Sequence, residues 1–251
     1  MADKTTHIIL GATGGIGSEL CRHLSKTGAN LVLAARDEDK LKKLADELGS
    51  EHHSLDATKS AEVDDLFADT VDEHGSIYGV ANCVGSFLIK PAHLTSDDEF
   101  AYTISQNLTT AFNVVRSAAR NMPDGGSVAL LSSVAARVGL SNHEAIAAAK
   151  AGVAGLALSA AASYAGRGLR FNVVAPRLVE TLMTANVTRS STARQASLGL
   201  HPLGRLGEPK DIASALGFLL DPANDWISGQ TFGVDGGLSA LRPLPRRSPR
   251  N

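Results

Sequence analysis

Six short apolar runs alternate with longer amphipathic segments along the 251 residues of this chain. The runs cover residues 7–10, 30–34, 80–84, 127–131, 170–174 and 231–234, and a further short strand is predicted to end at Leu55. Between them, apolar residues recur at helical spacing over 16–26, 37–48, 61–74, 97–120 and 209–220, and an alanine-rich stretch precedes residue 170. This alternation constrains the fold most, because continuously apolar runs are typical of parallel strands buried on both faces.

The pattern predicts a doubly wound α/β fold, in which parallel strands are joined by right-handed helical crossovers. We expect a single domain over residues 1–240, because no linker or shift in composition divides the chain and its length suits one core. The basic, proline-rich segment 241–251 cannot form a helix or a central strand, so we expect a mobile extension there.

The composition excludes several other classes of protein. A hydrophobic share of 43% with 20% charged residues is that of an ordinary globular chain. A net charge of −2 argues against nucleic acid or an anionic membrane as the main partner. No signal peptide and no run of eighteen uncharged apolar residues is visible, which predicts a cytoplasmic protein. Cys21 and Cys83 lack metal-ligand spacing, so no metal site is expected.

A glycine-rich segment, GATGGIG at residues 11–17, directly follows the first apolar run and opens a helical pattern. Glycines at this place permit a tight turn and let backbone N–H groups approach a pyrophosphate, and the helix N-terminus adds its dipole. A strand, a glycine turn and a helix in this order predict a dinucleotide-binding site.

The spacing Gly-x-x-x-Gly-x-Gly resembles that of the short-chain dehydrogenase/reductase family, and the resemblance continues along nearly the whole chain. Asn82-Cys83-Val84-Gly85 stands where that family usually has Asn-Asn-Ala-Gly, and residues 234–237 read Val-Asp-Gly-Gly. The resemblance implies a Rossmann-type fold with a mostly parallel seven-stranded sheet and a nicotinamide-dependent oxidoreductase. It also implies cofactor contacts from Gly11, Thr13, Gly15, Ile16, Gly17, Asp56, Ala57, Asn82, Gly85, Lys150, Pro176, Val179 and Thr181, and catalytic roles for Ser133, Lys150 and Asn107.

The end of the second strand indicates which nicotinamide is used. Enzymes that prefer NAD place a carboxylate there to bind the ribose hydroxyls, but by spacing from Gly11 this position is Ala35. Arg36 follows and suits a 2′-phosphate, whereas Asp37 comes late and suits a helix N-cap. The sequence therefore favours NADP over NAD, with a solvated strand-end charge as the other interpretation of Arg36.

The proton donor of the family is missing from its usual place. The resemblance implies a tyrosine thirteen residues after Ser133 and four before Lys150, and Ile146 occupies that position. Isoleucine has no proton to give, so the usual mechanism cannot operate unchanged. None of the three tyrosines, Tyr78, Tyr102 and Tyr164, stands where it would replace the donor.

His143 is the candidate replacement, seven residues before Lys150. If the helix already includes His143, then His143, Ile146 and Lys150 share one face. This resembles the enoyl-acyl-carrier-protein reductase branch, whose tyrosine lies seven residues before the lysine with an apolar residue between them. Imidazole is a competent proton donor near neutral pH. The other interpretation is a surface or capping residue of an alanine-rich helix.

Three functions follow as hypotheses. The first is an NADP(H)-dependent oxidoreductase acting on a small-molecule carbonyl or alcohol with an atypical proton donor, and the second is an enoyl-type reductase using His143 and Lys150. The third is a dinucleotide-binding protein without turnover, a sensor or scaffold. The polar stretch 184–202 is expected to cover the substrate, and Arg177, where the family usually has glycine, either crowds the nicotinamide loop or points outward. Small residues over 145–162 resemble the family's subunit interface and favour a homodimer or homotetramer.

Overall fold

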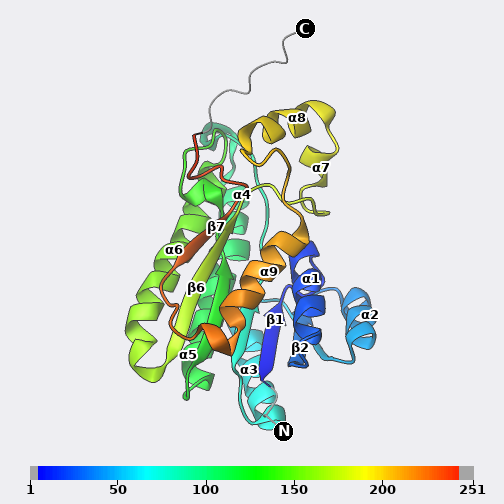
Figure 1. Cartoon of the computed structure of the whole chain (residues 1–251), viewed down its shortest axis with the longest axis vertical. Coiled ribbons are helices and arrows are strands. Elements are labelled where there is room, and N and C mark those ends of the chain that lie inside the picture. Colours follow the sequence, from blue (N-terminus) through cyan, green and yellow to red (C-terminus); the bar gives the residue numbers. More distant parts are fainter. Residues whose placement is uncertain (1–4, 243–251) are drawn as a thin grey trace.

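The computed structural model describes residues 5–242 and forms a single seven-stranded sheet with helices on both faces (Figure 1). The strand order is β3-β2-β1-β4-β5-β6-β7, and every neighbouring pair is parallel. The doubly wound fold is therefore confirmed, and the sheet is wholly rather than mostly parallel. The strands are β1 Thr6–Leu10, β2 Asn30–Ala35, β3 Glu51–Ser54, β4 Gly79–Asn82, β5 Gly126–Leu131, β6 Leu169–Pro176 and β7 Thr231–Val234. The expected extension beyond residue 242 lies outside the described residues.

The helices divide between the two faces of the sheet. They are α1 Gly15–Ser25, α2 Glu38–Leu48, α3 Ser60–His74, α4 Asp97–Ile104, α5 Thr110–Asn121, α6 Glu144–Tyr164, α7 Ala185–Thr188, α8 Ser191–Leu200 and α9 Pro209–Leu220. One core joins α3, α5 and α6 to the sheet, and the other joins α1, α2 and α9 to it. In β1, Ile8 and Leu10 enter the first core while Ile9 enters the second, because successive strand residues point to opposite faces.

The helix expected over residues 97–120 is interrupted. α4 ends at Ile104, a π-helical turn spans Ser105–Thr109, and α5 continues from Thr110. Asn107 lies in that turn, buried, and its amide donates back to the carbonyl of Thr103 at 2.8 Å. Single π-turns inside α-helices are frequent at functional sites.

Two other boundaries differ from expectation. β3 ends at Ser54, so Asp56 lies in the loop beyond the strand rather than at its end. α6 begins at Glu144, so His143 is the N-cap residue and the premise that the helix includes it is wrong. The cause is local: Asn142 adopts φ 63°, a left-handed conformation that no helical residue has.

The polar stretch after β6 forms two short helices, α7 and α8, which lie together at the end of the molecule opposite the N-terminus (Figure 1). They stand over the carboxyl ends of the strands, where ligands bind in open α/β sheets. Of the helices within residues 5–242, one is long and apolar enough to cross a membrane: the stretch Glu144–Arg167, which contains α6. Its buried residues Val153, Ala157, Ala160 and Ala161 belong to the core against the sheet, as expected of a core helix in a globular domain.

Candidate active site

Two adjoining cavities open at the carboxyl ends of β1, β2, β4, β5 and β6. The first has a volume of about 310 Å³ and the second about 140 Å³, and Cys83, Val84, Gly85 and Met183 border both. A shared wall allows one extended molecule to occupy both cavities. Of the predicted cofactor residues, the first cavity is lined by Gly11, Thr13, Arg36, Asp56, Ala57 and Gly85. The second is lined by Ile16, Gly85, Lys150, Pro176, Val179 and Thr181.

The glycine loop has the geometry that a pyrophosphate needs. Gly11 adopts φ 74°, and a Cβ on Gly17 would overlap the carbonyl oxygen of Gly11. The N-cap of α1 is Gly14, which has no side chain to satisfy the first N–H groups of the helix. Those donors and the helix dipole therefore remain available to an anion in the first cavity. Gly15 lies against Thr181 and does not itself line either cavity.

The far end of the first cavity carries two cations and two carboxylates. Asp37 is the N-cap of α2: it accepts from the backbone N–H of Lys40 at 3.1 Å and pairs with its Nζ at 2.6 Å. Asp56 accepts two hydrogen bonds from Thr58, which hold the pKa of its carboxyl below the usual value. Arg36 lines this end and has no ion pair within residues 5–242. Sequence reasoning missed Lys40, which lies in the first turn of α2 and pairs with the N-cap residue Asp37.

Asn82 does not line either cavity. It is buried at the end of β4, where its Oδ1 accepts from the N–H of Val84 at 3.1 Å and its amide donates to Thr110 at 3.3 Å. Asn82 therefore supports the turn that carries Gly85 into both cavities.

The second cavity brings together all four predicted catalytic residues, Ser133, Lys150, Asn107 and His143, with Ile146 beside them. Four elements contribute: the loop after β5, the N-terminal half of α6, the π-turn before α5 and the N-cap of α6. Ser133 follows β5, and its Oγ accepts from the N–H of Ala135 at 3.1 Å, which leaves the hydroxyl proton free to be donated.

Lys150 is only 8% exposed, and its Nζ donates to the carbonyl of Leu131 at 2.8 Å. Burial lowers the pKa of this ammonium to about 8, with no carboxylate near enough to restore it. Asn107 lies on the other side of Gly85: a Cβ on that glycine would stand 2.9 Å from the Asn107 Oδ1 and 3.5 Å from the Lys150 Nζ. The glycine is thus needed to keep space between these two polar groups.

His143 is 7% exposed, so it is not a surface residue, and its side chain makes no capping hydrogen bond to α6. Its Nδ1 lies 2.7 Å from the carbonyl oxygen of Ser141 and its Nε2 has no hydrogen-bond partner. Because a carbonyl can only accept, Nδ1 carries a proton, and Nε2 is the atom left to exchange one. The surface interpretation of His143 therefore fails on burial, and His143 occupies the N-cap position of α6 without making a side-chain cap.

No tyrosine reaches either cavity, and all three lie within the described residues. Tyr102 is 53% exposed on α4. Tyr164 is the last residue of α6 and packs on Phe171, and Tyr78 packs edge-on against His7 before β4. Ile146 is 4% exposed and lines the second cavity with apolar surface.

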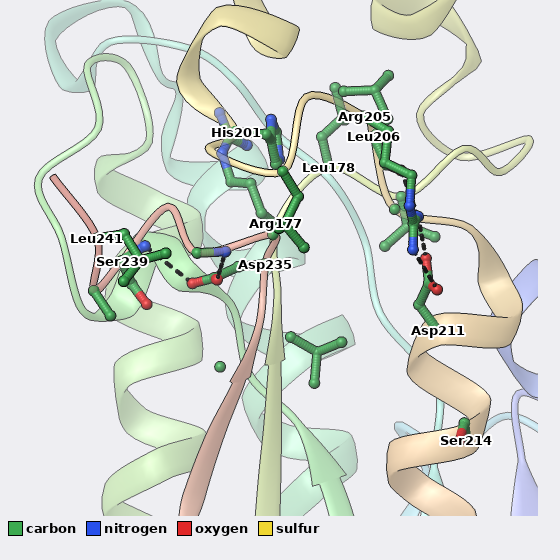
Figure 2. Close-up of a pocket in the computed structure, with 18 of the residues that line it drawn as sticks. Arg177, Leu178, His201, Arg205, Leu206, Asp211, Ser214, Asp235, Ser239 and Leu241 are labelled. Carbon is green, nitrogen blue, oxygen red and sulfur yellow. Dashed lines mark hydrogen bonds and ion pairs between the residues drawn. The ribbon is translucent and has the colours of Figure 1, made fainter. Parts of the chain in front are cut away.

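Arg177 takes neither of the two paths expected from the sequence. It is half-buried after β6 and borders the second cavity on one side and a third, larger cavity of about 900 Å³ on the other (Figure 2). Burial lowers the pKa of its guanidinium.

Comparisons with known proteins agree with this fold and identify its family. Residues 11–239 match the family model described as Enoyl-(Acyl carrier protein) reductase. The chain is 32% identical over 243 residues to "Short-chain dehydrogenase/reductase aba4" of Botryotinia fuckeliana, covering 91% of this chain and 94% of the relative. It is 32% identical over 235 residues to 3-oxoacyl-[acyl-carrier-protein] reductase FabG of Vibrio cholerae, covering 92% and 96%. A solved short-chain type dehydrogenase/reductase from Mycobacterium ulcerans superposes with a TM-score of 0.91 at 28% identity, covering 96% of this chain and 92% of that one.

Proposed function

Since the chain belongs to the short-chain dehydrogenase/reductase family, we propose that it interconverts a small-molecule carbonyl and its alcohol with NADP(H), using His143 where the family has tyrosine. The observation that carries this proposal is the His143 Nε2. It is buried, has no partner, and belongs to a residue that lines the same cavity as Ser133 and Lys150. An unpaired polar atom in such a place is costly unless it meets a ligand.

In the direction of reduction, the protonated His143 ring donates its Nε2 proton to the carbonyl oxygen of the substrate. A bound nicotinamide dinucleotide supplies the hydride that reaches the carbonyl carbon. Ser133 donates a hydrogen bond from Oγ to the same oxygen, and the Nδ1–H bond to the Ser141 carbonyl holds the ring in one orientation. Ile146 contributes no proton and excludes water from the reacting atoms.

Lys150 and Asn107 are expected to hold the nicotinamide end of the cofactor. Their polar groups flank Gly85, which borders both cavities, so they stand where the two halves of an extended dinucleotide would meet. The Lys150 Nζ offers donors to ribose hydroxyls while it keeps its bond to Leu131.

The preference for NADP rests on the far end of the first cavity. Arg36 lacks an ion pair there, and Lys40 stands beside it, so two cations surround the place of a 2′-phosphate. Asp37, the carboxylate that follows β2, is committed to the cap of α2 and to Lys40, and Asp56 accepts hydrogen bonds from Thr58. A 2′-hydroxyl of NAD would find no free acceptor from Asp37.

Reduction of a carbon–carbon double bond is the second candidate. His143 and Lys150, seven residues apart, line one cavity with Ile146 between them, which is the arrangement that resembles the enoyl reductase branch. A turnover assay with NADPH against both simple ketones and enoyl thioesters separates the two reactions.

The test compares His143→Gln with His93→Gln, a matched control at an exposed histidine of the loop before α4. His143→Gln is expected to lower kcat by about 10²–10⁴-fold, the usual contribution of general acid catalysis, and to leave NADPH affinity unchanged. His93→Gln should match wild type. Full turnover by His143→Gln would refute the role of the imidazole, and NADPH binding without turnover on any substrate would favour the sensor or scaffold.

We also propose that this single domain works in the cytoplasm as a homodimer or homotetramer. One side of α6 packs on the sheet, whereas the small residues Ala148, Ala151 and Gly155 are exposed with Leu158, which is 61% exposed. Small exposed residues let a second copy of the helix approach closely. Light scattering tests this by measuring the molar mass of the assembly for wild type and Ala151→Arg. A lower mass is expected only for the variant, because the arginine would keep a second copy of α6 from approaching.

A further inference from the structure

The third cavity lies between the carboxyl end of β7, the start of α9 and the end of α8, and it shares a wall with the candidate active site. Arg177, Leu178 and Val179 border both spaces. At about 900 Å³ it is also far larger than the 140 Å³ catalytic cavity, so most of a substrate longer than a few atoms would have to extend into it.

Most charges around this cavity are already paired. Arg205 makes a two-point contact with Asp211, at 2.6 and 2.8 Å, which Figure 2 shows on the side of α9. The Lys210 ammonium lies 2.6 Å from the Glu208 carboxylate. These four side chains therefore neutralise one another and leave no net charge for a ligand.

The remaining acid on the cavity wall is Asp235. Its carboxylate accepts from the N–H groups of Gly237 at 2.8 Å and Ser239 at 3.1 Å (Figure 2). Burial raises the pKa of Asp235, but hydrogen bonds from Ser239 and Gly237, together with the nearby Arg137 guanidinium, hold it below its usual value. The Asp235 carboxylate is thus occupied by hydrogen bonds within its own turn.

Two side chains on the wall each carry a buried nitrogen without a hydrogen-bond partner. Arg177 has no ion pair within the described residues, and its Nε is buried without a hydrogen bond. His201 is 4% exposed; its Nδ1 lies 2.6 Å from the Ser197 carbonyl oxygen, and its Nε2 has no partner. Figure 2 shows both side chains in the upper part of the cavity, beneath α8. The exposed His23 also borders the cavity, on the side of α1.

We propose that Arg177 and His201 bind the carboxylate of an anionic oxo or hydroxy acid whose reacting carbon lies in the neighbouring catalytic cavity. The guanidinium presents a forked set of donors that matches a carboxylate. The Nδ1 proton of His201 is committed to the Ser197 carbonyl, so Nε2 donates to a carboxylate oxygen when the ring is in its imidazolium form. This inference rests on the proposed function, because it names the substrate class of that same site.

The first experiment measures binding to the full chain without turnover. Ligand-observed NMR with linear oxo acids from 4-oxopentanoate to 8-oxononanoate, each beside its methyl ester, gives a Kd for the charged and the neutral form. At least one acid is expected to bind about tenfold to hundredfold more tightly than its ester, the usual worth of a charge-assisted hydrogen bond. Inorganic phosphate at the same concentration should not displace that acid.

The variants assign the effect to one residue. Arg177→Gln should abolish the preference for the acid and Arg177→Lys should keep part of it, because lysine retains the charge but not the fork. Arg120→Gln is the matched control, since it removes one arginine charge on α5, where Arg120 pairs with Asp64. His201→Gln should weaken binding of the acid and leave binding of the ester unchanged. A melting curve for each variant verifies folding.

The outcomes separate this inference from the proposed function. Equal binding of every acid and its ester, or an Arg177→Gln variant that keeps the preference, overturns the carboxylate site. If acids bind through Arg177 but neither acids nor esters turn over with NADPH, the carboxylate site stands and the proposed reaction fails. If esters and acids turn over with equal kcat/KM, the reaction stands and the carboxylate site fails.

Discussion

Replacing Lys150 with methionine is expected to remove a pH dependence of folding stability that begins near pH 8. The Lys150 ammonium is 8% exposed, and burial lowers its pKa from 10.5 to about 8. An unfolded chain keeps the ordinary pKa, so between these values the unfolded state binds more protons than the folded state. By proton linkage, the free energy of unfolding must then rise with pH through this window.

The magnitude follows from the two pKa values. Below pH 8 both states hold the proton and the folded state bears the whole cost of burying a charge. At pH 9.5 the folded amine is neutral while the unfolded one is still charged, which adds about 2 kcal/mol to the free energy of unfolding relative to pH 7. The buried thiols act in the opposite direction, because burial raises the pKa of Cys83 to about 12 and that of Cys21 further.

The assay is urea unfolding from pH 7 to 9.5 on cofactor-free wild type and Lys150→Met. Subtracting the variant curve from the wild-type curve removes the contribution of the thiols, which both proteins share. The difference should rise by about 2 kcal/mol, starting near pH 8. A difference that stays flat across this range would show that Lys150 is not a desolvated ammonium and would refute the reasoning.

Three further outcomes are expected. Arg36→Ala should weaken NADPH binding by about tenfold or more and leave NADH binding nearly unchanged, measured by cofactor fluorescence; equal losses would contradict a contact to the 2′-phosphate. Gly79→Ala should destabilise the fold by about 1–3 kcal/mol in urea, because the added Cβ would overlap the buried His7 ring, and unaltered stability would argue against that packing. Burial lowers the pKa of His7 from 6.5 to about 4, so the unfolded chain takes up a proton first and stability should fall by about 3 kcal/mol as the pH drops from 6.5 to 4. The same measurement of unfolding free energy against pH on His7→Leu should lack this loss of stability. Identical curves for wild type and variant would exclude His7 as its cause.

Local patterns were enough to place most of the fold. The apolar runs placed six of the seven strands, and the glycine loop placed the start of α1, because strand burial and tight turns depend on residues near in sequence. The ends of helices and strands were harder to predict where a contact between residues distant in sequence decides them. The interruption at Asn107 is one case, since its side chain bonds to Ser86 from another part of the chain as well as to Thr103.

The sequence by itself predicted that Ile146 stands where the family has its tyrosine, and it showed that Ser133, Asn107 and Lys150 are present. It could not decide between a catalytic and a capping His143, because that depends on which nitrogen is bonded and what surrounds the ring. The tertiary structure decided that the Nε2 of a buried His143 lacks a partner, and that Arg177 borders two cavities. The physical reason is that burial and pairing arise from elements distant in sequence, which no local pattern records.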